Sequence, residues 1–169
     1  ADASAQQMNN LMLVELNEPS LLNNLRARFE QQKPYTYTGE LELMCLNPYE
    51  KLPCYDEAVM QACKEGVYAE PHIWAMSERI FRALSDKGTL AQSVVVSGEI
   101  GAGKTETNKQ LMNYLAWRSV RGPDGEVKEG AGDGKKDLSA TIVATEPLLE
   151  AFGNAKTSRN NNSSRFGKF

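Results

Sequence analysis

The sequence predicts an α/β fold in which a mixed β-sheet is flanked by helices, and three consecutive segments carry this prediction. Gln92–Ser97 is a short run rich in β-branched residues, which is typical of a buried strand. A glycine-rich loop follows at Gly98–Thr105. The stretch Glu106–Val120 then has apolar residues at helical spacing and contains neither glycine nor proline. We therefore expect a strand, a tight loop and a helix in direct succession.

The N-terminal part of the chain predicts a lead-in followed by a helix. Residues 1–7 are small and polar, so we expect them to be disordered. Asn17-Glu18-Pro19 opens the helix, because proline suits the first turn. The expected apolar stripe of this helix is Leu21, Leu22, Leu25 and Phe29. Arg26 and Arg28 lie off the stripe, and we interpret both as residues of a solvated face.

A hairpin and a short helix are predicted next. Tyr35–Thr38 and Leu41–Leu46 have the composition of two strands, and Gly39 marks the turn after the first. A short helix follows the proline-containing loop, from about Asp56 to Lys64.

A longer helix is predicted from near Pro71, with Gly88 at its C-cap. Its expected buried residues are Ile73, Met76, Ile80 and Leu84. His72, the only histidine, lies in the first turn. We interpret it as a surface or capping residue, since no partner side chain points to a catalytic or metal-binding role.

The C-terminal third changes in composition. Residues 121–137 hold glycines, a proline and charges of both signs, which is typical of a flexible surface loop. Pro147 should interrupt the helical stretch that follows, and Gly153-Asn154 should end it.

Bulk properties narrow the functional classes. The chain has 169 residues, 41% hydrophobic and 24% charged, as expected for a soluble domain. A net charge of −3 argues against a general nucleic-acid binder, and we find no apolar run long enough to span a membrane and no secretory leader. Cys45, Cys54 and Cys63 lack metal-ligand clustering, which suggests reduced thiols in the cytosol.

The glycine-rich loop fits the phosphate-binding pattern G-x-x-x-x-G-K-[ST]. Its residues are Gly98, Glu99, Ile100, Gly101, Ala102, Gly103, Lys104 and Thr105. In such a loop, backbone N–H groups and a helix N-terminus face the phosphates. Lys104 would reach the β- and γ-phosphates, and the Thr105 hydroxyl would ligate Mg²⁺. A chance match in a glycine-rich turn has a probability of about one in a hundred, and the flanking segments lower it further.

Three further blocks resemble the head of myosin motors. Leu149–Phe169 is similar to the switch I region of that family, and Asn47–Tyr55 to the loop that touches the purine. Pro71–Ala75 resembles the stretch before the phosphate-loop strand. The resemblance implies a phosphate-loop NTPase core of the myosin type that is incomplete in this chain, with residues 1–169 forming part of a motor domain that stops just after switch I. It also implies that residues 121–137 are the variable loop beside the nucleotide pocket, although a neutral insertion is equally compatible with their composition.

The resemblance also implies roles for residues outside the phosphate loop. The purine contacts are Asn47, Pro48 and Tyr55. In switch I, Asn160 contacts the α/β-phosphate region, Ser163 lies near the attacking water, and Ser164 binds Mg²⁺ beside Thr105. Arg165 pairs with a switch II glutamate, whose D-x-x-G-F-E segment does not occur in this chain. On composition alone, residues 160–165 could instead be a polar loop that solvates a turn.

Three departures from the family pattern affect the predicted site. Ile100 replaces the serine usual in the phosphate loop and removes a hydroxyl close to the γ-phosphate. Glu50 stands where a basic residue is frequent, although Lys51 could supply a nearby cation. Thr107-Asn108 inverts the common order, with little predictable effect.

The leading hypothesis is an ATP-dependent actin-based motor that uses ATP and Mg²⁺ in the cytoplasm, associated with the cytoskeleton. Actin filaments would bind through regions absent from this chain, and light chains or calmodulin could bind the full-length protein. The isolated piece should be inactive, because the third side of the γ-phosphate site is missing. The alternatives are a degenerate myosin-like protein that binds ATP without efficient turnover and a different phosphate-loop kinase or NTPase.

Overall fold

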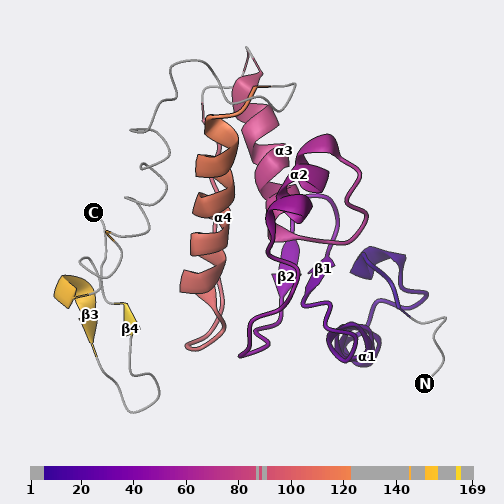
Figure 1. The fold of residues 1–169 in the computed structure, drawn as a ribbon. Helices are drawn as coiled ribbons and strands as arrows, with labels where there is room; N and C mark the ends of the chain where they lie inside the picture. Colours follow the sequence, from indigo (N-terminus) through magenta and orange to yellow (C-terminus); the bar gives the residue numbers. More distant parts are fainter. Residues whose placement is uncertain are drawn as a thin grey trace. The chain divides into compact units, whose positions relative to one another are not determined.

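The computed structural model describes residues 6–86, 88, 91–122, 145, 151–155 and 163–164. The chain divides into two compact units, residues 1–92 and 93–169, and each is described here by itself. The ribbon in Figure 1 follows both units from the N-terminus to the C-terminus.

The first helix, α1 (Glu18–Phe29), begins where the sequence predicts. Asn17 caps it by accepting a hydrogen bond from Ser20 N at 2.9 Å, and Pro19 lies in the first turn. The buried face differs from the predicted stripe, because Leu22 and Phe29 are exposed whereas Leu25 is buried. Asn24 and Arg28 complete the buried face at helical spacing. Polar side chains can occupy this face because each of them finds hydrogen-bonding partners.

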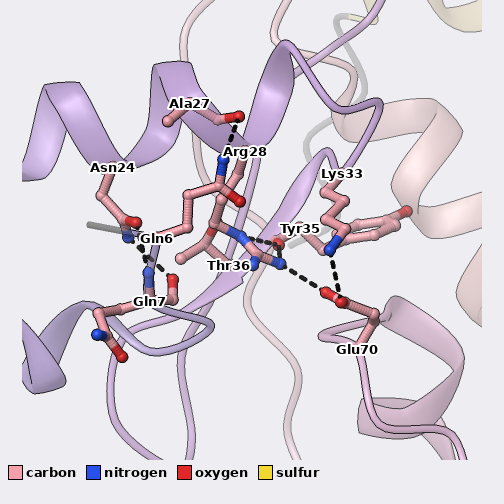
Figure 2. Close-up of polar contacts among 9 residues, drawn as sticks. All are labelled: Gln6, Gln7, Asn24, Ala27, Arg28, Lys33, Tyr35, Thr36 and Glu70. Carbon is pink, nitrogen blue, oxygen red and sulfur yellow. Dashed lines mark hydrogen bonds and ion pairs between the residues drawn. The ribbon is translucent and has the colours of Figure 1, made fainter. Parts of the chain in front are cut away.

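The prediction that Arg28 is solvated is wrong. Its side chain is 2% exposed, and its guanidinium donates to Tyr35 O at 2.9 Å, Thr36 Oγ1 at 3.0 Å and Glu70 Oε2 at 3.1 Å. Lys33 donates to the other oxygen of the same carboxylate at 2.8 Å (Figure 2). Arg26 is 80% exposed as predicted and forms an ion pair with Glu30, the C-cap residue of the same helix.

Hydrogen bonds to α1 fix the end of the predicted lead-in. Gln6 Nε2 donates to Ala27 O at 3.1 Å, and Gln7 N donates to Asn24 Oδ1 at 2.8 Å (Figure 2). Asn24 in turn donates to Gln7 O and to Asn10 Oδ1. Gln6 and Gln7 are therefore ordered, while residues 1–5 lie outside the described residues.

The predicted hairpin is confirmed as strands β1 (Tyr35–Tyr37) and β2 (Leu43–Cys45). They pair antiparallel with Thr36 opposite Met44, and Gly39 adopts a positive φ of 81° in the connection. A 3₁₀ helix, η2 (Asn10–Met12), precedes α1, and Asn9 forms an isolated parallel bridge with Tyr37. The N-terminal segment thus covers the free edge of β1.

Two helices follow the hairpin. The predicted short helix is confirmed as α2 (Glu57–Glu65), capped by Asp56 and ended by left-handed Gly66. Helix α3 (Ile73–Ser85) lies against α2 (Figure 1). The residue at the C-cap of α3 is Asp86 rather than Gly88.

The buried face of α3 also differs in part from the prediction. Ile73 is buried as expected, but Met76 and Ile80 are half-buried and Leu84 is exposed. The fully buried positions are Trp74, Ser77 and Glu78. The core of the first unit consists of Leu25, Tyr35, Leu52, Met60, Cys63, Ile73 and Trp74.

In the second unit the predicted helix is confirmed as α4 (Lys104–Ser119), which buries Leu111, Tyr114 and Arg118. The predicted strand at Gln92–Ser97 is wrong: residues 91–99 have no regular structure, and Val95 is 88% exposed. A strand requires neighbours for its N–H and C=O groups. Among the described residues no strand lies beside this segment, so it remains unpaired.

Strands β3 (Asn154–Ala155) and β4 (Ser163–Ser164) form a second antiparallel pair, with Asn154 opposite Ser164. Residues 151–153 are helical and the strand begins at Asn154, which confirms the predicted helix stop at Gly153-Asn154. Pro147 and residues 123–137 of the predicted loop lie outside the described residues. The described strands thus form two antiparallel pairs, where the sequence predicted one mixed sheet.

Removing the charge of Glu70 should destabilise the first unit. Burial acts to raise the pKa of Glu70, but hydrogen bonds from Lys33 and Arg28 outweigh it and hold the pKa below its usual value. Glu70→Gln leaves the buried Arg28 without its counter-charge, and we expect a loss of about 1–2 kcal/mol in the free energy of unfolding. Urea denaturation measures it. The matched control is Glu30→Gln, which breaks the exposed pair with Arg26 and should cost less than about 0.5 kcal/mol; equal losses in the two variants would contradict this account.

Candidate nucleotide-binding site

The glycine-rich loop folds as a tight turn directly before α4. Gly98, Gly101 and Gly103 have positive φ values of 152°, 86° and 92°. A Cβ atom at Gly98 would lie 3.0 Å from the Ala102 Cβ, so the loop closes too tightly for a side chain there. Ala102 N donates to Glu99 O at 3.2 Å across the turn.

The N-terminus of α4 is built to receive an anion. Gly103 is the N-cap residue and supplies no side chain to the N–H groups of the first turn. These groups and the helix dipole favour a negative charge at this end. Lys104, the first residue of the helix, bends back so that Nζ donates to Gly98 O and Glu99 O, each at 2.8 Å. The loop and the helix N-terminus therefore combine backbone donors with a cation bound to two loop carbonyls.

Two other loop residues bear on phosphate chemistry. Thr105, the predicted Mg²⁺ ligand, is exposed in the first turn of α4, next to Lys104. Ile100 is 52% exposed, so half of an apolar side chain faces solvent at the tip of a loop expected to hold phosphates.

The predicted purine-binding segment lies in the first unit and starts with a hydrogen-bonded turn. Asn47 Oδ1 accepts a hydrogen bond from Tyr49 N at 2.9 Å, which closes a turn two residues long. Tyr49 adopts a left-handed φ of 54° and is 84% exposed. Glu50 and Lys51 are also exposed, so both charges face solvent beside Pro48.

Tyr55, at the end of this segment, belongs to a buried aromatic cluster that the sequence did not predict. The Tyr55 hydroxyl lies 2.7 Å from the Tyr35 hydroxyl, and its ring centroid lies 5.4 Å from His72 and 5.5 Å from Trp74. Tyr68 joins the cluster with its ring 5.5 Å from His72. The aromatic residues of the first unit are a sequence signal for such a cluster, but their pairing depends on the tertiary fold.

The sequence predicted that His72 is a surface or capping residue. It caps α3, but it does not lie at the surface. Nδ1 accepts a hydrogen bond from Trp74 N at 3.1 Å, and the side chain is 1% exposed. Burial lowers the pKa of His72 to about 4, and the Cys54 backbone opposes the shift only in part. Nε2 makes no hydrogen bond of normal geometry within the described part of the chain. His72 is therefore a neutral, buried imidazole.

The buried His72 predicts a loss of stability in mild acid. Its pKa falls from about 6.5 in an unfolded chain to about 4 in the folded one, so the unfolded state binds the proton first. The contribution of the neutral imidazole to the free energy of unfolding should be fully present above pH 6.5. It should decrease as the pH falls towards 4, by about 2 kcal/mol between pH 7 and pH 5. Denaturant titrations at several pH values measure this slope. Because His72 is the only histidine, His72→Gln should flatten the curve in this range, and an unchanged slope would contradict the assignment.

The predicted switch I residues are described only in part. Ser163 and Ser164 form β4, opposite Ala155 and Asn154. Asn160 and Arg165 lie outside the described residues, so their predicted roles stay predictions.

Two further absences concern the described residues only. They contain no group of three or more His, Cys, Asp or Glu side chains that could hold a metal ion. No described helix has both the length and the apolar character needed to cross a membrane. Cys45, Cys54 and Cys63 form no disulfide in this part of the chain.

Comparison with known proteins gives consistent matches. The family described as "Myosin head (motor domain)" matches residues 7–169. "Myosin-11" of Arabidopsis thaliana is 46% identical over 157 residues, which cover 91% of this chain and 10% of that protein. "Myosin type-2 heavy chain 2" of Schizosaccharomyces pombe is 44% identical over 91% of this chain and 7% of its own length. "Myosin-I heavy chain" of Dictyostelium discoideum is 44% identical over 91% of this chain and 6% of its own. The chain thus spans a tenth or less of each of these relatives.

Proposed function

The chain belongs to the myosin head (motor domain) family, and from this premise we propose that it carries part of the nucleotide site of an ATP-dependent, actin-based motor. Family membership implies a phosphate-loop NTPase core. The observation that carries the proposal is the glycine-capped N-terminus of α4, with Lys104 folded over the loop that precedes it.

The phosphate loop would act by holding charge. An ammonium has three N–H groups, so the two bonds from Lys104 to loop carbonyls leave one for a phosphate oxygen. The carbonyls of Gly98 and Glu99 hold that donor in place before a nucleotide arrives. The other backbone N–H groups between Ile100 and Thr105 would face the β-phosphate, since Ala102 N already donates to Glu99 O. Phosphoryl transfer depends mainly on such positioning and on neutralising charge.

We propose that Mg²⁺ binds the Thr105 hydroxyl together with Ser164, as the family resemblance implies. The ion neutralises charge that develops on the β- and γ-phosphate oxygens. Ser163 would orient the attacking water, Asn160 would contact the α/β-phosphates, and Arg165 would pair with a carboxylate from a later part of the head. Asn47, Pro48 and Tyr55 would contact the purine of the same nucleotide.

The partners and location follow from the same premise. We propose that the full-length protein binds actin filaments through regions outside this chain, binds light chains or calmodulin, and works in the cytoplasm on the cytoskeleton. Hydrolysis of Mg·ATP by the full-length protein, measured with and without filamentous actin, tests the proposal. We expect actin to accelerate turnover, and turnover indifferent to actin would contradict a motor function.

A second candidate is a myosin-like protein that holds ATP without efficient turnover. The half-exposed Ile100 favours it, because this side chain supplies no hydroxyl where the family usually has a serine. Tight Mg·ATP binding without hydrolysis, in the presence or absence of actin, would support this second candidate over the motor. A different phosphate-loop kinase is not supported, since the family match runs over residues 7–169.

A further inference from the structure

The Tyr55 side chain is held from three directions by other elements. Its hydroxyl meets the hydroxyl of Tyr35 on β1 at 2.7 Å. Its ring packs at a tilt against His72 and edge-on against Trp74 at the start of α3. Tyr55 itself is half-buried, so part of the side chain stays at the surface of the unit. A side chain held in this way loses little conformational freedom when a ligand binds to it.

His72 lies at the centre of this aromatic cluster. Four rings of the described residues have centroids 5.0–5.5 Å from the imidazole, namely Tyr35, Tyr55, Tyr68 and Trp74. The hydrogen bond from Trp74 N to Nδ1 fixes the imidazole to the first turn of α3. Tyr55 is therefore coupled to the start of α3 through the His72 ring as well as through its own contact with Trp74.

A phenylalanine would fill the same space without burying a polar atom. His72 buries two ring nitrogens, of which Nδ1 accepts the capping hydrogen bond from Trp74 N. Among these residue types only histidine can both accept the capping hydrogen bond and present a ring to its neighbours. Its contact with Tyr55 is made by the ring, which a phenylalanine would keep.

We propose that His72 is a positioning residue that holds Tyr55 in place for contact with the purine base, with the Tyr35 hydroxyl fixing the other end of Tyr55. This inference rests on the proposed function, in which Tyr55 touches the base. It adds that base recognition depends on residues of β1 and α3 that do not touch the nucleotide. The phosphate grip, which depends on Lys104 and its loop, is independent of this cluster.

The test compares two ligands in the full-length protein. Mg·ATP makes both base and phosphate contacts, whereas Mg·pyrophosphate makes only phosphate contacts. The ratio of the two affinities therefore measures the contribution of the base contacts to binding. His72→Asn keeps an acceptor at the N-cap but removes the ring. We expect its affinity for Mg·ATP to fall about tenfold, with Mg·pyrophosphate affinity unchanged. His72→Phe keeps the ring and loses the cap, and it should retain the wild-type ratio within about twofold.

A matched pair of milder variants keeps the test decisive if His72→Asn does not fold. Tyr35→Phe and Tyr68→Phe each remove one hydroxyl from a ring that packs on His72, but only Tyr35 bonds to Tyr55. Tyr35→Phe should lower the ratio about threefold, and Tyr68→Phe should leave it unchanged.

The outcomes separate the two proposals. Equal losses for both ligands, or an unchanged ratio in both His72→Asn and Tyr35→Phe, would overturn the positioning role. A wild-type protein that binds neither ligand would instead overturn the proposed nucleotide site.

Discussion

The Lys104→Ala variant of the full-length protein is expected to lose detectable Mg·ATP binding. The Lys104 ammonium is fixed against the predicted phosphate loop by its hydrogen bonds to Gly98 O and Glu99 O. Removing a hydrogen-bonded charge that meets an anionic ligand typically costs about 2–5 kcal/mol. That corresponds to a loss of affinity of roughly thirtyfold to several thousandfold, and isothermal titration calorimetry measures it.

The matched control for this experiment is Lys109→Ala on the same helix. Lys109 lies five residues after Lys104, more than one helical turn further from the loop. It has the same formal charge but cannot reach a phosphate held at the helix N-terminus, so its removal should leave the affinity within about twofold. Unchanged ATP affinity in Lys104→Ala would overturn the phosphate-loop assignment, and equal losses in the two variants would indicate only a general effect of charge.

Local signals predicted most helices of this chain correctly. Asn17 and Asp56 each cap a helix through hydrogen bonds to residues three positions later, and Gly66 ends α2 in a left-handed conformation. These interactions connect residues within one turn, so the sequence alone specifies them. The hairpin around Gly39 was predictable for the same reason.

Predictions that depend on distant partners were less successful. Arg28 is buried because Glu70, 42 residues away, supplies its counter-charge. No local pattern distinguishes Arg28 from the exposed Arg26. The run at Gln92–Ser97 has the composition of a strand, but a strand forms only where neighbouring strands pair with it.

The candidate site shows the same division. The tight turn before α4 could be predicted because a pattern of eight consecutive residues specifies its backbone, and all three of its glycines adopt positive φ values. The support of Tyr55 could not be predicted, because β1, the α2–α3 connection and α3 each contribute a ring to the cluster around His72. A sequence motif can identify residues expected to contact a ligand. The residues that support them from other elements can be identified only from the tertiary structure.

Ile100→Ser is expected to raise the rate of ATP hydrolysis by the full-length protein while leaving ATP affinity nearly unchanged. Serine would supply a hydroxyl that can donate to the γ-phosphate or to the charge that develops on it, whereas isoleucine supplies none. Donors directed at developing charge contribute up to about a hundred- to a thousandfold to the chemical step, although neighbouring backbone N–H groups compensate part of the loss. Ground-state binding depends mainly on the loop amides, Lys104 and Mg²⁺, so it should change little.

The conformation of the loop bears on this expectation. Ile100 is 52% exposed, so packing against the following helix covers at most half of its side chain. A serine at this position would therefore have access to solvent and to a ligand above the loop. Single-turnover hydrolysis of the natural protein beside Ile100→Ser measures the effect, with Ile100→Val as the control that keeps a β-branched apolar side chain. A faster chemical step in Ile100→Ser alone would show that the natural isoleucine slows hydrolysis for lack of a donor. Equal rates in all three proteins would mean that the missing hydroxyl has no catalytic consequence, and that backbone donors of the loop carry the γ-phosphate by themselves.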